Sequence, residues 1–368
     1  MQVEKLARQC ILDRKEYVPG KPVEEVEREL GICDIIKMAS NENPLGTSPL
    51  ALEAMIRELQ TNANRYPESL CHDLVGKLSQ VHGLVPERFF LDNGADGVIT
   101  MIGLTFIDPG DEVVYGALSF PAYQNIATKM DGVCVPLPLT DDYRLDIDGF
   151  IAAITPRTKV VFLCNPNNPT GTIVTHEEFE RLLEAVPDDV LLVSDEAYYE
   201  FADRPDYPQT IPYLESHPNL IILRTFSKVM GLAGLRVGYA IAHPDVIRVM
   251  LKAREPFPVN RIAQAGALAA LDDTDFIVRT LETNRQGREQ FYAAFEELGL
   301  RYYPTQTNFI FVDLERPVGP LFDGMLRRGV IVRPLTPQGV PHGMRVTIGT
   351  REQNERTLEA LREVLRDL

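Results

Sequence analysis

The sequence predicts an α/β protein, with a large domain built on a mostly parallel central sheet covered by helices and a smaller α+β domain. Three observations carry this prediction. The middle of the chain alternates short aliphatic runs with stretches of helical length, the pattern of a parallel sheet. Beyond "REPFPVN" this alternation ends. The 368 residues, 45% hydrophobic and 24% charged, suffice for two domains with a large core.

The predicted strands of the large domain follow one another at α/β spacing. They are the runs "RFFLDNG", "DEVVYG", "TKVVFLCNP", "DVLLVSDEAY", "NLIILRTFSK" and "GLRVGYAIA". A helical apolar stretch over residues 95–107 follows the first of them, "PAYQNIATKM" follows the second and "HEEFERLLEAV" the third. These crossovers indicate helices on both faces of the sheet.

The last part of the chain has a different pattern. It is helical over residues 263–298, then gives "TNFIFVDL", a helix over 321–328, "VIVRPL", "MRVTIG" and a closing amphipathic helix. We therefore predict a large ligand-binding domain over residues 41–257. The N-terminal arm, residues 1–40, and residues 258–368 form the small domain.

Charge and composition exclude several classes of function. A net charge of −16 disfavours a nucleic acid or an anionic membrane as partner, since both would repel the chain. The N-terminus carries scattered charges, and the longest apolar run, "VITMIGLTFI", is too short to span a bilayer. We expect a cytoplasmic protein that binds small molecules.

Metal and hydrolase motifs are absent from the sequence. The five cysteines never form CxxC, and the six histidines include no HExxH, so we expect no disulfide framework and no metal site. There is no Walker A loop and no G-x-S-x-G. The sequence therefore gives no support for a metal-dependent hydrolase, a serine hydrolase or a nucleotide hydrolase.

Polar and reactive side chains follow the predicted strands, where parallel α/β sheets bind their ligands. They lie in residues 93–96, 119–120, 165–168, 195–198 and 225–228, with Arg236 on the next strand. Together they supply an amine, a carboxylate, an aromatic face, a phenol, amides, hydroxyls and a helix N-terminus. These groups suit a phosphorylated aromatic aldehyde with a basic ring nitrogen.

Seven motifs in a fixed order extend this pattern over nearly the whole chain. They are "YVPGKP", "SNENPLG", "NRYP", "NPNNPTG", "DEAY", "RTFSK…GLAGLRVGY" and "RVTIGTREQNE". With them the chain resembles the fold-type I aminotransferases that depend on pyridoxal 5'-phosphate (PLP), most closely the branch that acts on histidinol phosphate. The resemblance implies the fold-type I architecture, a PLP cofactor and a homodimer.

The resemblance also assigns roles around the cofactor ring. Lys228 would form the Schiff base with the PLP aldehyde and then move a proton as the released amine. Asp195 would keep the ring nitrogen protonated, Tyr198 and Asn168 would hold the ring's 3'-oxygen, and Phe120 would stack on the ring. Each residue alone also has a structural explanation: a surface lysine, an N-cap aspartate, an Asn-Pro turn or a core phenylalanine.

A second implied group would bind the cofactor phosphate. It comprises Gly94, Ala95, Asp96, Thr225, Ser227, Arg236 and, from the neighbouring subunit, Tyr66. The chain departs from the family pattern at two positions here, with Ala95 in place of a hydroxyl residue and Gly97 in place of a glutamate. One phosphate hydrogen bond is missing as a result, at a cost of about 1 kcal/mol.

Four residues are implied in substrate binding. Arg345 would grip the α-carboxylate of glutamate or, in its place, the phosphate of histidinol phosphate, with Arg333 as a second cation. Tyr17 and Asn43 match the remaining substrate contacts. Arg333 could alternatively be a structural arginine at a strand end. The alternative for Tyr66 is an exposed loop tyrosine without a binding role.

The implied reaction is amino transfer in two halves that share one site. It interconverts histidinol phosphate with 2-oxoglutarate and imidazole-acetol phosphate with glutamate, a step of histidine biosynthesis. Three alternatives stay open: an aromatic amino acid aminotransferase, a threonine-phosphate decarboxylase, and a PLP-binding ligand sensor without turnover.

Overall fold

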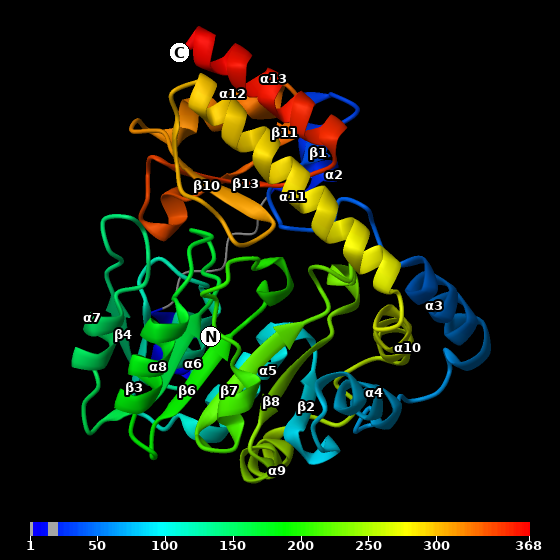
Figure 1. The fold of residues 1–368 in the computed structure, drawn as a ribbon, viewed down its shortest axis with the longest axis vertical. Helices are drawn as coiled ribbons and strands as arrows, with labels where there is room; N and C mark the ends of the chain where they lie inside the picture. The colour runs from blue at the N-terminus through cyan, green and yellow to red at the C-terminus, as the bar shows by residue number, and fades with distance from the viewer. Residues whose placement is uncertain (1–2, 14–20) are drawn as a thin grey trace.

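A computed structural model describes residues 3–13 and 21–368 of the chain. Its centre is a seven-stranded sheet in the order β2-β8-β7-β6-β5-β3-β4 (Figure 1). Only β8 runs antiparallel to its neighbours, which confirms the predicted mostly parallel sheet. The strands are β2 (Phe89–Asp92), β3 (Glu112–Gly116), β4 (Val133–Leu137), β5 (Thr158–Cys164), β6 (Leu191–Asp195), β7 (Leu220–Thr225) and β8 (Gly238–Ala242).

Helices cover both faces of this sheet, because alternate side chains of each strand point to opposite faces. Val160 and Phe162 pack in one buried cluster, whereas Val161 and Leu163 pack in the other. The first cluster is closed by α5 (Gly94–Phe106), α6 (Ala122–Lys129) and α9 (Pro244–Ala253). The second is closed by α4 (His72–His82), α7 (Ile147–Ala152), α8 (His176–Ala185) and α10 (Arg261–Ala270).

A smaller antiparallel sheet in the order β12-β13-β10-β9 forms a second layered unit. Its strands are β9 (Arg301–Tyr302), β10 (Phe309–Asp313), β12 (Arg333–Pro334) and β13 (Gly343–Thr347). Residues of α11 (Thr274–Glu297), α12 (Val318–Arg327) and α13 (Arg351–Asp367) complete its core. This is the α+β arrangement expected for the small domain.

The N-terminal arm joins the small sheet's side of the molecule. β1 (Ile36–Lys37) pairs in parallel with β11 (Val330–Ile331), and α2 (Val23–Leu30) packs Val26 against Leu326 and Ile331. α3 (Pro49–Asn62) lies beside α10 (Figure 1). The remaining short elements are α1 (Gln9–Leu12) and the 3-10 turns η1 (Val3–Leu6), η2 (Pro86–Arg88), η3 (Tyr199–Phe201), η4 (Ile211–Leu214), η5 (Ala233–Leu235) and η6 (Thr336–Gln338).

The packing of α10 bears on the predicted domain boundary at residues 257 and 258. Ala263, Ala267 and Ala270 belong to the core cluster of the large sheet, whereas Phe291 and Phe295 of α11 belong to the core of the small sheet. We therefore propose that the small domain begins within α11 rather than at residue 258. In the part of the chain that is described, no helix has both the length and the apolar character to cross a bilayer.

Candidate active site

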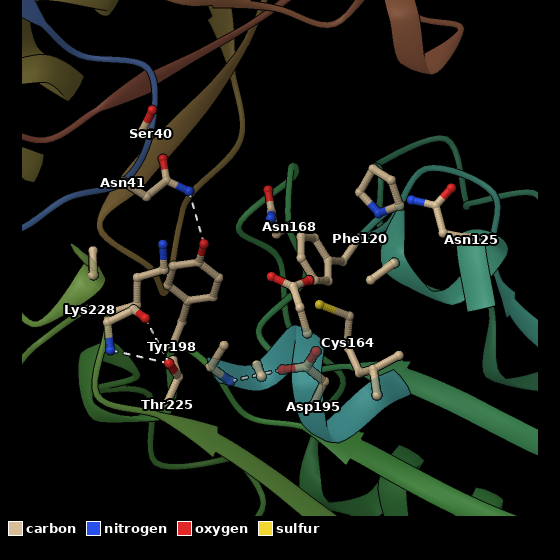
Figure 2. A pocket seen from close by; sticks show the side chains of 18 of the residues that line it. Ser40, Asn41, Phe120, Asn125, Cys164, Asn168, Asp195, Tyr198, Thr225 and Lys228 are labelled. Carbon is tan, nitrogen blue, oxygen red and sulfur yellow. Dashed lines mark hydrogen bonds between the residues drawn. The ribbon is translucent and has the colours of Figure 1, made fainter. Parts of the chain in front are cut away.

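A cavity of about 590 Å³ lies at the carboxyl ends of β5, β6 and β7. One side is formed by the large sheet, and the other by Arg333, Gln338 and Arg345 together with the segment 39–42. Twelve of the predicted site residues line it: Ala95, Asp96, Phe120, Asn168, Asp195, Tyr198, Thr225, Ser227, Lys228, Arg236, Arg333 and Arg345. Figure 2 shows several of them around the opening.

Lys228 follows β7 and lies in the cavity, with its Nζ 5.5 Å from the centre of the Tyr198 ring. Burial and the positive charges of Arg345 and Arg236 lower the pKa of Lys228 to about 8, while Glu42 and Asp96 act in the opposite direction. A larger share of the lysine is therefore the neutral, nucleophilic amine near neutral pH. Lys228 can attack a carbonyl carbon placed in this cavity.

Asp195 ends β6 and is 2% exposed. Its Oδ2 accepts a hydrogen bond from the Tyr123 hydroxyl at 2.6 Å, and its Oδ1 accepts one from the Ala197 backbone at 3.1 Å. Burial raises the pKa of Asp195 to about 6, against these two hydrogen bonds, which lower it. A buried carboxylate of this kind can hold a cationic ring nitrogen.

The Tyr198 hydroxyl accepts a hydrogen bond from Asn41 Nδ2 at 2.9 Å (Figure 2). Burial raises the pKa of Tyr198 to about 12, so the phenol is neutral at neutral pH. Because the hydroxyl oxygen that accepts from Asn41 keeps its own hydrogen, Tyr198 can donate that hydrogen to an anionic oxygen in the cavity.

An anion-binding group forms another part of the cavity wall. Arg236 donates to Asp96 across 3.0 Å, and Thr225 donates to the Ser227 hydroxyl at the same distance. Helix α5 begins at Gly94 without a side-chain cap, so its first N–H groups are open to an anion. Gly94 has a φ of 76°, in the left-handed region that favours glycine, and a Cβ there would also lie 2.7 Å from Arg236 Nη2.

Gly97, one of the two departures from the family pattern, has a steric reason. A Cβ at Gly97 would lie 2.6 Å from Asp92 Oδ1, which accepts a hydrogen bond from the Asn93 backbone. The carboxylate of Asp92 therefore occupies the space that a side chain at position 97 would need. For Ala95 the structure offers no comparable reason.

Arg345 and Arg333 face each other in register on β13 and β12. Arg345 is 8% exposed and donates from Nη1 to Asn168 Oδ1 and from Nη2 to the Ala39 carbonyl, each at 2.6 Å. Two guanidinium groups on one wall suit a substrate carboxylate or phosphate. Phe120, also on the cavity wall, meets the Tyr123 ring edge to face with centroids 5.9 Å apart.

Three predicted residues do not line the cavity. Asn43 donates instead to the Val229 carbonyl at 2.9 Å and to the Thr280 hydroxyl at 3.0 Å, so it connects the Lys228 loop to α11. Tyr66 is 79% exposed and stacks on Phe257. Gly94 lies next to the cavity, behind Arg236. Tyr17 lies outside the described residues.

Sequence reasoning missed several residues that do shape the site. Asn41, Glu42 and Gln338 line the cavity, and Tyr123 contacts Asp195 from behind it. The motif "SNENPLG" could have indicated Asn41, but it offers two asparagines without showing which one faces the ligand. For Gln338 and Tyr123 the sequence gives no signal beyond their neighbours.

The chain is similar over most of its length to proteins of one family. The sequence model of the family described as "Aminotransferase class I and II" matches residues 33–361. A histidinol-phosphate aminotransferase of Moorella thermoacetica is 47% identical over 359 residues, which cover 97% of this chain and 92% of that protein. One of Brevibacillus brevis is 44% identical and covers 97% and 98%.

Solved structures give the same result. Histidinol-phosphate aminotransferase of Sinorhizobium meliloti in complex with pyridoxal-5'-phosphate superimposes with a TM-score of 0.89 and 29% identity, covering 98% of this chain and 97% of that one. A Thermus thermophilus aspartate aminotransferase, 24% identical with a TM-score of 0.83 over 97% and 99% of the two chains, shares the fold. These likenesses confirm the predicted fold class.

Proposed function

The chain belongs to the class I and II aminotransferase family, and from this premise we propose that it is a PLP-dependent aminotransferase that acts on histidinol phosphate. One observation carries the proposal. A single cavity joins the Lys228 amine, the buried Asp195 carboxylate and the anion-binding group around Arg236. The relatives that share 41 to 47% of their residues with the chain carry this activity in their names.

The residues of the cavity fit PLP. Thr225, Ser227, Arg236 and the open N-terminus of α5 would hold the phosphate, and the cavity of about 590 Å³ has room for both cofactor and substrate. When bound, PLP supplies an aldehyde that joins covalently to amines and a ring that accepts electrons from the adjacent carbon.

The chain's own groups prepare this chemistry. Lys228 provides a neutral amine to bind the aldehyde carbon and later a base that moves a proton at the substrate's amine-bearing carbon. Asp195 would keep a proton on the ring nitrogen, and Tyr198 and Asn168 would donate to the ring oxygen. Phe120 would form a flat apolar wall for the ring.

Substrate binding would fall to the two arginines. Arg345, already oriented by Asn168 and Ala39, would hold the α-carboxylate of glutamate or the phosphate of histidinol phosphate, and Arg333 would add a second positive charge. Both substrates carry an anionic group near the amine-bearing carbon, a carboxylate attached to it in glutamate and a phosphate attached through a CH2–O group in histidinol phosphate. The same wall can therefore serve both half-reactions.

We propose that the enzyme works in the cytoplasm. We also propose that it is a homodimer, in which each chain pairs with a second copy of itself. Exposed large apolar side chains gather on α3 and the loops near it, with Leu52, Ile56 and Leu59 on α3 about half exposed. Tyr66 and Phe257 form an exposed stacked pair in the same region. A patch of this kind on a soluble protein marks an interface, and Tyr66 would reach the neighbouring subunit's phosphate site.

A panel of amino donors tests the proposed function. Protein loaded with PLP is mixed with histidinol phosphate, glutamate, phenylalanine, tyrosine or threonine phosphate, while the cofactor spectrum and the products are followed. Conversion of the cofactor to its amino form by histidinol phosphate and by glutamate is expected. Conversion by phenylalanine or tyrosine alone indicates an aromatic aminotransferase, release of CO2 from threonine phosphate a decarboxylase, and an unchanged spectrum a ligand sensor.

A further inference from the structure

Asp195 is held from behind the cavity by a residue that does not itself line it. Tyr123, on α6, is 0% exposed, and its hydroxyl donates to Asp195 Oδ2 at 2.6 Å. Ala197 donates its backbone N–H to the other oxygen, Oδ1. The two hydrogen bonds fix the carboxylate plane on both sides, and only one of them comes from a side chain.

The position of the Tyr123 ring is itself determined by aromatic packing. The ring stacks on Phe162 of β5, with centroids 4.6 Å apart and an angle of 11° between the planes. It also packs against the Phe120 ring in a T-shaped arrangement, with an angle of 82° between the planes. Tyr123 therefore contacts two of the residues that would surround the cofactor ring, Asp195 through its hydroxyl and Phe120 through its ring.

Resting on the proposed function, we propose that Tyr123 is a positioning residue that orients Asp195 and keeps it ionised, so that its carboxylate meets the ring nitrogen of PLP. The hydroxyl is the part of the side chain that carries this role. Replacing Tyr123 by phenylalanine keeps the buried ring and removes only the hydroxyl.

The charges around Asp195 make the hydroxyl important. Burial, with a smaller contribution from the charges of Asp96 on α5 and the neighbouring Glu196, raises the pKa of Asp195 to about 6, and the Tyr123 hydrogen bond is the strongest influence that lowers it. Burial also raises the pKa of Cys164, on β5, to about 12, so this thiol is neutral. The pKa of Tyr123 lies well above its usual value of 10, and the tyrosine stays a neutral donor.

Loss of the Tyr123 hydroxyl should change the pKa of Asp195 in one direction only. Without it the pKa of Asp195 rises above 6 towards neutrality, and a larger fraction of the carboxyl is protonated at neutral pH. A protonated carboxyl does not attract a ring cation. The effect shrinks as the pH rises, because the carboxyl ionises again.

The test compares Tyr123→Phe with Tyr115→Phe. Tyr115 is 4% exposed, belongs to the same core cluster and has no hydrogen bond to Asp195, so it serves as the matched control. The affinity of the apo protein for PLP is measured from about pH 6 to about pH 9, together with the thermal unfolding of each apo protein. The PLP affinity of each variant is divided by that of the wild type at the same pH. Because Lys228 titrates in all three proteins, its effect cancels in this ratio.

We expect Tyr123→Phe to bind PLP about tenfold more weakly than the wild type near pH 7, with the ratio returning towards one at high pH. Tyr115→Phe should stay within about twofold of the wild type at every pH. A Tyr123→Phe protein with wild-type affinity would overturn the inference. So would one that is weakened equally at all pH values, because this result indicates a packing defect. Failure of the wild type to bind PLP would instead contradict the proposed function.

Discussion

The Arg345 guanidinium donates to the Asn168 side-chain oxygen across 2.6 Å, and this hydrogen bond joins the small sheet to the loop after β5. The same guanidinium donates to the Ala39 carbonyl in the N-terminal segment. One side chain thus connects three parts of the chain that are far apart in sequence. An arginine held in this way is oriented before an anion arrives.

Arg345→Lys should therefore be a severe change although it keeps the positive charge. Lysine lacks the planar fork and cannot replace both hydrogen bonds, so we expect kcat/KM for amino donors to fall about 100-fold. Arg351→Lys, on α13 with a side chain that is 87% exposed, is the control and should change nothing. Steady-state kinetics of the two variants decide the matter, and equal activities would count against a substrate-binding role for Arg345.

Asp195 should destabilise the apo protein once its carboxyl is ionised. Its pKa is about 6 in the fold against 3.8 for an ordinary aspartate, so stability falls as the pH rises from 3.8 to about 6 and stays low above that range. Asp195→Asn removes the buried charge and should stabilise the apo protein by about 1 to 3 kcal/mol near pH 8, while it weakens PLP binding. Urea unfolding measures the first effect. An apo variant less stable than the wild type would refute the expectation.

Glu196, the residue after Asp195, forms a buried ion pair with Arg224, the residue before Thr225. Arg224 donates from Nε and Nη2 to Glu196 Oε2 at 3.0 and 2.8 Å, and the two side chains are 5% and 2% exposed. Arg224→Met leaves a buried unpaired carboxylate and should cost about 3 to 5 kcal/mol of unfolding free energy.

The double variant Arg224→Met, Glu196→Leu is the control for this pair. It removes both charges and should recover most of the lost stability, because apolar side chains of similar size can replace a buried ion pair. Equilibrium unfolding in urea measures all three proteins. If the double variant is as unstable as the single one, the cost does not come from the unpaired charge.

Tyr66 offers a test of the proposed homodimer. If Tyr66 of one subunit completes the neighbouring site, mixing the inactive Lys228→Ala protein with a weakened Tyr66→Ala protein creates mixed dimers with one intact site. Subunit exchange at equal concentrations should then restore about a quarter of the wild-type activity. A mixture no more active than the Tyr66→Ala protein alone would argue that Tyr66 acts within its own chain or not at all.

Much of the site could be predicted, because the sequence shows the order of the strands and which polar residues stand at their ends. Lys228 and Asn168 follow strands of a mostly parallel sheet and Asp195 ends one, and parallel strands bring their ends to one edge. The same topology explains why residues 60 positions apart line one cavity.

Other features depend on contacts that no local pattern shows. Asn41 and Asn43 belong to one motif, yet only Asn41 faces the cavity, and its backbone takes the left-handed conformation with φ at 56°. Gly97 is a glycine because of Asp92, and Tyr123 matters because of Asp195 on another element. The alanine-rich face of α10 fits either core, and only the fold assigns it to the large sheet.

The central claim is that the Lys228 amine is the group that binds the PLP aldehyde. Borohydride reduction of the PLP-saturated protein, followed by peptide mass mapping, tests it directly, since reduction makes the bond between amine and cofactor permanent. We predict one phosphopyridoxyl group per chain, located on Lys228, and none in the Lys228→Ala protein. A saturated protein in which Lys228 stays unmodified, or in which another lysine carries the label, would contradict the account.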